Sequence, residues 1–87
     1  MGLDTVELVL SVEKLFEIEI PDEVAEKLDT VGKLHQFIVS EHKRLNRPNV
    51  SSEIIFDQLR TIISYQLSVK PEQIIPEARF VQHLGEN

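Results

Sequence analysis

Apolar residues recur at helical spacing in three long segments of this chain, and all four prolines lie outside those segments. The first segment covers residues 3–16, where most positions are apolar. Its polar positions follow one stripe at spacings of three and four: Asp4, Glu7, Ser11 and Lys14. A helix that is apolar on most sides is normally surrounded by other elements. We therefore predict a central helix over residues 3–16.

A short helix and a second long helix are expected next. Pro21 restricts the backbone, and acidic residues follow it at the start of residues 22–28, where the helix dipole favours them. Asp29 or Thr30 can cap a helix that continues to residue 45. Its apolar stripe is Val31, Leu34, Ile38 and Leu45, with Phe37 beside it. Gly32 weakens the first turn.

A third long helix follows a turn at residues 46–50, which contain Pro48. Ser51 or Ser52 can cap it, and it extends over residues 53–67. Its apolar stripe is Ile55, Leu59, Ile62, Ile63 and Leu67. The last twenty residues contain two prolines but are too apolar for a free tail. We expect them to form a long ordered loop packed on the helices, which makes the chain all-α.

Composition limits the class of protein. The 87 residues suffice for one small domain, and there is no cysteine to form a disulfide or a thiolate metal site. The net charge of −6 argues against nucleic acid as a partner, and no apolar run is long enough to span a membrane. Residues 1–29 hold nine acidic and two basic residues. These features predict a cytoplasmic protein with an acidic first third.

Two stretches of this chain resemble the acyl carrier protein family. Residues 2–9 read Gly-Leu-Asp-Thr-Val-Glu-Leu-Val, where the family motif is Asp-Ser-Leu-Asp-Thr-Val-Glu-Leu-Val. Residues 2–45 resemble the second part of the family's sequence, and residues 53–87 resemble its first part, with residues 46–52 as a linker. The resemblance implies an antiparallel four-helix bundle with three longer helices, one short helix and a long loop.

The prosthetic-group position is altered. The family attaches 4'-phosphopantetheine to the motif serine, and Gly2 stands in that position, flanked by Asn87, Leu3 and Asp4 in the family's order. Glycine has no oxygen to phosphorylate, so we expect the cofactor to be absent here. Thr5 and Ser11 lie inside the predicted helix and are poor substitutes.

The order of the two parts indicates a circular permutation. If Met1 is only a start codon, joining Asn87 to Gly2 restores the family's order without a gap. A linker of seven residues could span up to about 23 Å. The alternatives to permutation are a window across two tandem carrier domains and two halves written out of order. A separate alternative for the motif is a native variant that never had the serine.

The resemblance also implies two sets of binding residues. Family members dock partner enzymes through acidic positions that correspond here to Asp4, Glu7, Glu13, Glu17 and Glu19, although Lys14 replaces a common acidic residue. The acyl cavity would be walled by Val9, Val12, Phe16, Ile20, Leu28 and Phe80. From the residues alone, the acidic set is explained equally well as a solvated face. The apolar set is explained better as ordinary core, because an apolar stripe at helical spacing is normally buried.

Catalysis has little support in the sequence. His35 and His42 are two turns apart on one predicted helix and are expected at the surface, with His83 alone in the loop. There is no nucleophile–base pairing, glycine-rich phosphate loop or metal-ligand spacing. We expect no enzyme, no catalytic residue and no metal site.

Two functions remain open. The chain is either an acyl carrier protein of fatty-acid or polyketide biosynthesis that is not loadable in this form, or a non-carrying interaction module that docks synthase partners through its acidic helix. Its expected partners are basic surfaces of acyl synthases and transferases. A monomer is expected, with a domain-swapped dimer as the alternative.

Overall fold

The computed structural model describes residues 3–47 and 51–80, and their side chains from residue 6 onward. The helices are α1 (Leu3–Phe16), α2 (Asp22–Ala25), α3 (Val31–Arg44) and α4 (Ser52–Leu67), followed by the 3₁₀ helix η1 (Pro71–Gln73). Over these residues there is no β-strand, only an isolated bridge between Thr30 and Arg79. The prediction of an all-α chain is confirmed.

Helix caps decide where the elements begin and end. Thr30 caps α3, because its hydroxyl oxygen accepts from the amide of Lys33 at 3.2 Å. Ser51 caps α4 in the same way, through the amide of Ile54 at 3.1 Å. The helix predicted over residues 22–28 is shorter than expected, because after Ala25 the amide-to-carbonyl bonds span three residues and tighten the chain into turns.

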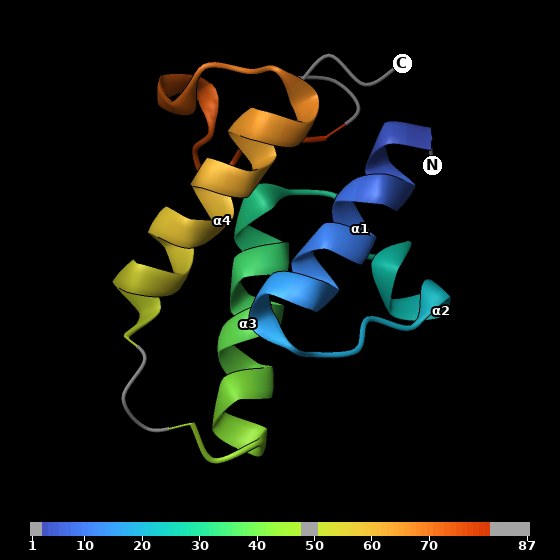
Figure 1. Ribbon diagram of the computed structural model, residues 1–87, viewed down its shortest axis with the longest axis vertical. Helices are drawn as coiled ribbons and strands as arrows, with labels where there is room; N and C mark the ends of the chain where they lie inside the picture. Colours follow the sequence, from blue (N-terminus) through green and yellow to red (C-terminus); the bar gives the residue numbers. More distant parts are fainter. Residues whose placement is uncertain (1–2, 48–50, 81–87) are drawn as a thin grey trace.

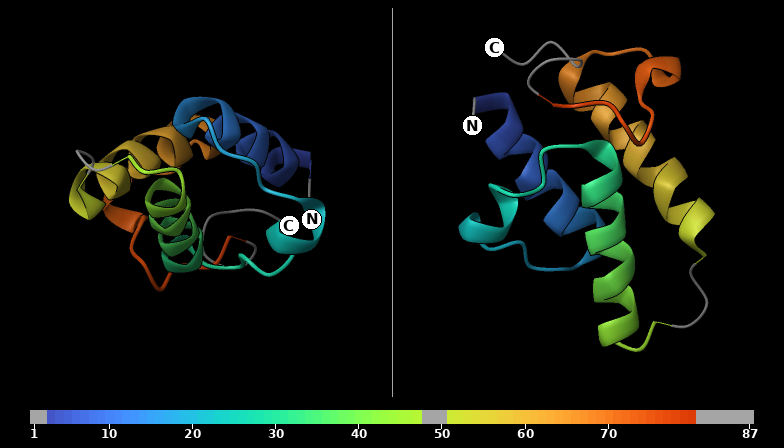
Figure 2. Two further views of the ribbon diagram at one scale, coloured as in Figure 1. Left: turned by 90° about the horizontal axis from the view of Figure 1, so that it is seen from below. Right: turned by 180° about the vertical axis from the view of Figure 1, so that it is seen from behind.

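The three long helices enclose one hydrophobic core (Figure 1). In Figure 1, α1 and α3 run downward, and α4 runs back up on the left-hand side of the bundle. The bundle is closed at the upper end by the segment after α4, as the view from behind also shows (Figure 2). Side chains buried at less than 2% exposure are Leu8, Val12, Val31, Ile38, Ile55, Leu59, Ile63 and Ile74.

The apolar stripe of α3 ends on a histidine. Val31, Leu34 and Ile38 are buried as predicted, but the next buried position is His42, which is 6% exposed. Leu45 lies past the end of α3 and is exposed. The expectation that His42 lies at the surface is therefore wrong, because residues 31, 34, 38 and 42 share one helix face.

The expectation that α1 is surrounded on most sides is also wrong. Val6, Leu10 and Leu15 are exposed, with Leu10 at 57%. Within the described residues, α1 packs mainly against α4 and through Leu8, Val12 and Phe16 against the core. A domain of this size has too few elements to cover every side of one helix.

The segment after α4 is tied to the start of α3. The amides of Val31 and Gly32 donate to the carbonyls of Ala78 and Pro76 at 3.0 and 2.9 Å. Asp29 pairs with Lys33 at 2.9 Å and lies 3.7 Å from Arg79. The hydrogen bond from Lys33 lowers the pKa of Asp29. Ile74, Ala78 and Phe80 are buried, as expected for a packed loop, whereas Ile75 is exposed. Val81 and Leu84 lie outside the described residues.

Gly32→Val is expected to lower the free energy of unfolding by about 1–3 kcal/mol. A Cβ at Gly32 would lie 3.0 Å from the carbonyl oxygen of Pro76, and this oxygen is held in place by the Gly32 amide. Urea denaturation followed by circular dichroism measures the loss. Gln36→Val, at an exposed position one turn further along α3, controls for the helix propensity of valine. Equal losses in both variants would contradict the close approach of this loop.

Candidate functional site

The outer surface of α1 carries both acidic and apolar side chains. Glu7 is exposed, and Val6 and Leu10 are exposed on the same helix, with Lys14 near its end. A hollow of about 460 Å³ is lined by Leu10, Ser11, Glu13, Lys14 and Ile18. The structure describes Asp4 in its backbone only. This surface can offer a partner both apolar contact and negative charge, which the sequence did not indicate for Val6 and Leu10.

Glu13 differs from the other predicted docking residues, because its carboxylate is used inside the protein. Its Oε2 accepts a hydrogen bond from the amide of Ile20 at 2.7 Å, and the side chain is partly buried. The Glu13 carbonyl also accepts from the amide of Ile18 at 3.2 Å. Glu13 therefore shapes the turn after α1, and this bond competes with contact to a partner.

The turn after α1 presents two exposed acidic residues. Glu17 has a left-handed backbone (φ 53°), which ends the helix, and its side chain is exposed. Glu19 follows with an exposed side chain. In Figures 1 and 2, α2 lies next to α1, and its first turn adds Asp22 and Glu23. The acidic positions of the first third thus lie on neighbouring elements.

Arg47 fastens this turn to the end of α3. Its guanidinium donates to the carbonyl oxygen of Phe16, and through Nη2 to the carbonyl oxygen of Glu17 at 2.7 Å. Its Nη1 also lies 3.3 Å from Nδ1 of His42, whose ring packs 5.9 Å from that of Phe16. Burial, together with the positive charge of Arg47, lowers the pKa of His42. This cluster was not predicted from the sequence. The one feature of the sequence that could have indicated it is the position of His42 on the apolar stripe of α3.

The six residues predicted to wall an acyl cavity lie in the core or against it. Val12, Phe16, Ile20 and Phe80 are buried. Val9 and Leu28 are partly buried and pack on the same cluster. The structure brings together all six residues. Side chains packed in this way can serve as ordinary core. An acyl chain could lie among them only if it pushed them apart.

Some hydroxyl and histidine side chains of the described part form hydrogen bonds within the protein. Ser11 accepts from Nε2 of Gln66 at 3.0 Å, which joins α1 to α4. Nε2 of His35 lies 2.8 Å from the Ser52 carbonyl oxygen and 3.1 Å from its hydroxyl. Gly2 and Asn87 lie outside the described residues, and Leu3 is described in its backbone only.

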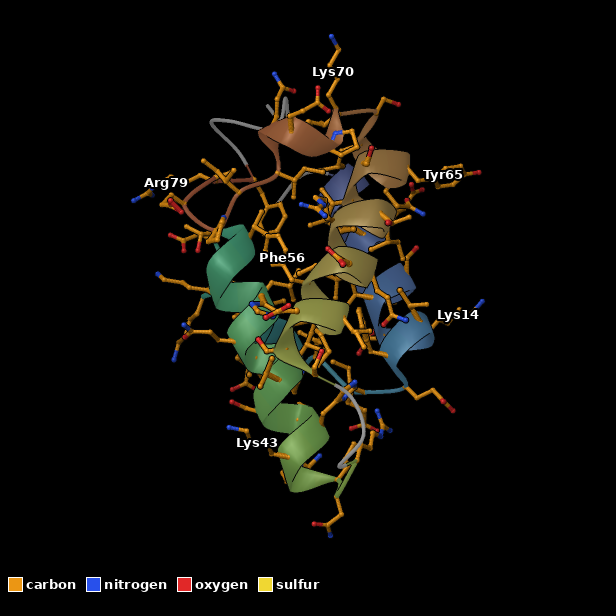
Figure 3. The ribbon with its side chains drawn as sticks, turned by 90° about the vertical axis from the view of Figure 1, so that its left-hand side faces the viewer. Lys14, Lys43, Phe56, Tyr65, Lys70 and Arg79 are labelled. Atoms are coloured by element: carbon orange, nitrogen blue, oxygen red, sulfur yellow. The ribbon has the colours of Figure 1, made fainter. Side chains whose placement is uncertain are left out.

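An open apolar groove lies between α1 and α4. It has a volume of about 410 Å³ and is lined by Leu15, Gln58, Thr61, Ile62 and Tyr65. Tyr65 is 82% exposed. Figure 3 shows Tyr65 and Lys14 extending to the same side of the molecule. Among the residues with described side chains, no three acidic or histidine groups gather as metal ligands, and no described helix is long and apolar enough to cross a membrane.

The comparison with protein families decides the membership of this chain. The sequence model described as "Acyl-carrier" matches residues 1–49, which is more than half of the chain. The chain belongs to the acyl-carrier family. The matched part contains α1, α2 and α3, and with them the acidic positions and five of the six core residues discussed above.

A curated relative agrees with this membership. The chain is 61% identical over 37 residues to an acyl carrier protein of Prochlorococcus marinus (strain MIT 9515). The aligned residues cover 42% of this chain and 46% of that protein. The chain thus spans about half the length of this relative. No solved structure matches the chain.

Proposed function

We propose that this acyl-carrier domain descends from carriers of fatty-acid or polyketide biosynthesis and is not loaded with a prosthetic group in this form. The acyl-carrier match over residues 1–49 supports the family part of the proposal. The rest depends on our alignment of residues 2–9 with the family motif, which puts Gly2 at the serine position. Attachment of phosphopantetheine needs a hydroxyl at that position. The residue present does not fit the group.

We further propose that residues 1–87 form a single circularly permuted domain, with residues 2–45 and 53–87 exchanged in order around the linker at residues 46–52. The family match ends within this linker. Helix α4, which follows the linker, packs on α1 and α3 and contributes Ile55, Leu59 and Ile63 to the shared core. In Figures 1 and 2, the red end of the described chain lies at the same end of the bundle as the start of α1. These observations favour one domain over a window across two.

The proposed docking surface consists of Asp4, Glu7, Glu17 and Glu19, with Glu13 as a secondary member because its carboxylate is bound to Ile20. Basic surfaces of acyl synthases and transferases complement this charge. Exposed ion pairs each contribute about 0–1 kcal/mol and are screened by salt, so binding would be weak and sensitive to ionic strength. Val9, Val12, Phe16, Ile20, Leu28 and Phe80 would enclose an acyl chain only in a form that carries one.

The alternative is a module that docks synthase partners and never carries cargo. Gly2 favours it, because the substitution removes attachment and leaves the acidic positions in place. Both proposals assign no catalysis to the chain itself. They differ in whether restoring a hydroxyl restores loading.

Intact-protein mass after incubation with a broad-specificity phosphopantetheinyl transferase and coenzyme A tests the proposal. We expect no gain for the unmodified chain and a gain of one phosphopantetheine for Gly2→Ser. Circular dichroism of both proteins shows whether the fold is intact.

The other outcomes are informative. A gain in the unmodified chain would place the arm on another hydroxyl, which tandem fragmentation would locate, and would contradict the assignment of Gly2 as a dead site. A folded Gly2→Ser chain that gains nothing would reject the permuted carrier and leave the docking module.

A further inference from the structure

The guanidinium of Arg47 joins three groups at the ends of α1 and α3. It donates to the carbonyl oxygens of Phe16 and Glu17, and its Nη1 approaches Nδ1 of His42 at 3.3 Å. Arginine has no acceptor, so this contact requires Nδ1 to accept. The geometry therefore corresponds to a neutral imidazole that carries its proton on Nε2.

Arg47 also stabilises the end of α1. The last carbonyl groups of a helix have no partner within the helix and form the negative end of its dipole. Arg47 supplies both donors and a positive charge to this end, although it follows α3 in sequence. Its own amide donates to the His42 carbonyl at 2.9 Å, which holds the backbones of the two residues together.

The surroundings of His42 offer the imidazolium little compensation. The hollow beside the ring has a volume of about 270 Å³ and is lined by Leu15, Phe16, Glu17, Arg47, Ile54 and Gln58 together with His42. Helix α4 thus contributes two uncharged residues, and α1 with its turn contributes Glu17. On α3 itself, Glu41 is paired with Arg44 at 2.8 Å, and Lys43 adds a positive charge.

We propose that His42 and Arg47 form a proton-controlled latch between the ends of α3 and α1. The latch is closed while the imidazole is neutral and opens when Nδ1 takes up a proton. Two donors and two positive charges would then face each other at a separation of 3.3 Å, and the contact cannot persist. The guanidinium leaves the carbonyls of Phe16 and Glu17, and the turn after α1 is released.

The sign of the pH dependence follows from the neutral ring. Burial and Arg47 lower the pKa of His42 below its ordinary value in the unfolded chain. The stability contributed by the neutral ring is fully present above that ordinary value. It is lost as the pH falls through the lowered pKa of the folded protein. The latch therefore opens on acidification, and this behaviour does not depend on whether the chain carries a prosthetic group.

Nuclear magnetic resonance on the whole chain tests the latch. Titration of the three imidazoles gives the pKa of His42. Hydrogen exchange of the Ile18 amide reports whether the turn is formed. This amide follows directly after Phe16 and Glu17, whose carbonyls Arg47 holds, and it donates to the carbonyl of Glu13. Between about pH 7 and a pH below the measured pKa of His42, we expect the protection of Ile18, corrected for intrinsic exchange, to fall several-fold. His42→Gln keeps an acceptor without a titrating group and should remove this dependence.

Two further variants complete the test. Arg47→Gln should leave Ile18 weakly protected at both pH values. His35 lies on the same helix but contacts Ser52 instead of Arg47. His35→Gln should therefore retain the pH dependence of Ile18 protection seen in the unmodified chain. The proposal is overturned if His42 titrates at or above the ordinary imidazole pKa, if Ile18 stays protected while His42 is protonated, or if His42→Gln keeps the same dependence. Should His42→Gln fail to fold, the first two measurements on the unmodified chain decide the matter.

Discussion

Leu59→Ala is expected to lower the free energy of unfolding by about 2–5 kcal/mol. Leu59 lies in the middle of α4 with 0% exposure, among side chains of the core shared by α1, α3 and α4. Truncation removes buried apolar contacts and leaves a cavity that close-packed neighbours fill only in part. Small domains have total stabilities of about 5–15 kcal/mol, so the loss is a large fraction of the whole. Urea denaturation followed by helical circular dichroism measures it.

The control for this variant is Tyr65→Ala, on the same helix at an exposed position. It removes a larger side chain from the surface and is expected to change stability far less. The comparison bears on domain organisation, because Leu59 lies outside the part matched by the acyl-carrier family. A small effect of Leu59→Ala, similar to that of Tyr65→Ala, would mean that α4 does not complete the core and would favour a window across two domains.

The second large effect is expected at the acidic positions. In a chain that also carries Gly2→Ser, reversing the charges of Glu7 and Glu19 should slow loading by a phosphopantetheinyl transferase about tenfold at low salt. Each reversal replaces an attraction to a basic surface with a repulsion, and two such changes of about 1 kcal/mol or less combine to about this factor. The difference should shrink as salt is added, because these charges are exposed. Initial rates from intact-protein mass measure it.

A matched control separates docking from net charge. Glu53→Lys with Glu72→Lys changes the net charge by the same amount, at exposed positions of α4 and η1. The control should load nearly as fast as its Gly2→Ser parent. Equal slowing in both double variants would show a general effect of charge and would remove Glu7 and Glu19 from the docking surface.

Some parts of the fold could be predicted because local chemistry decides them. The bounds of α1 agree with the apolar pattern, and α4 begins where Ser51 caps it. Ile55, Leu59 and Ile63 are buried as their spacing predicts. Helix periodicity and caps depend on neighbours three or four residues away, so a single sequence contains the information.

The candidate site was predicted less completely. Glu7, Glu17 and Glu19 are exposed, as docking requires, and remain proposals. Glu13 has the same charge and lies on the same helix, but its carboxylate is bound to the Ile20 amide. No periodic pattern distinguishes a carboxylate that faces solvent from one that turns back to cap a loop, because the path of that loop is a tertiary property.

The sequence by itself determined the helical class, the bounds of α1 and the acyl-carrier membership suggested by residues 2–9. Only the tertiary structure decided which apolar residues stay exposed on α1, and that a histidine rather than Leu45 continues the stripe of α3. It also brought Arg47 to the end of a helix thirty residues earlier in the chain. The physical reason is the same in each case: burial and long-range hydrogen bonds depend on which elements pack together, and periodicity shows which face of a helix is apolar but not which partner covers it.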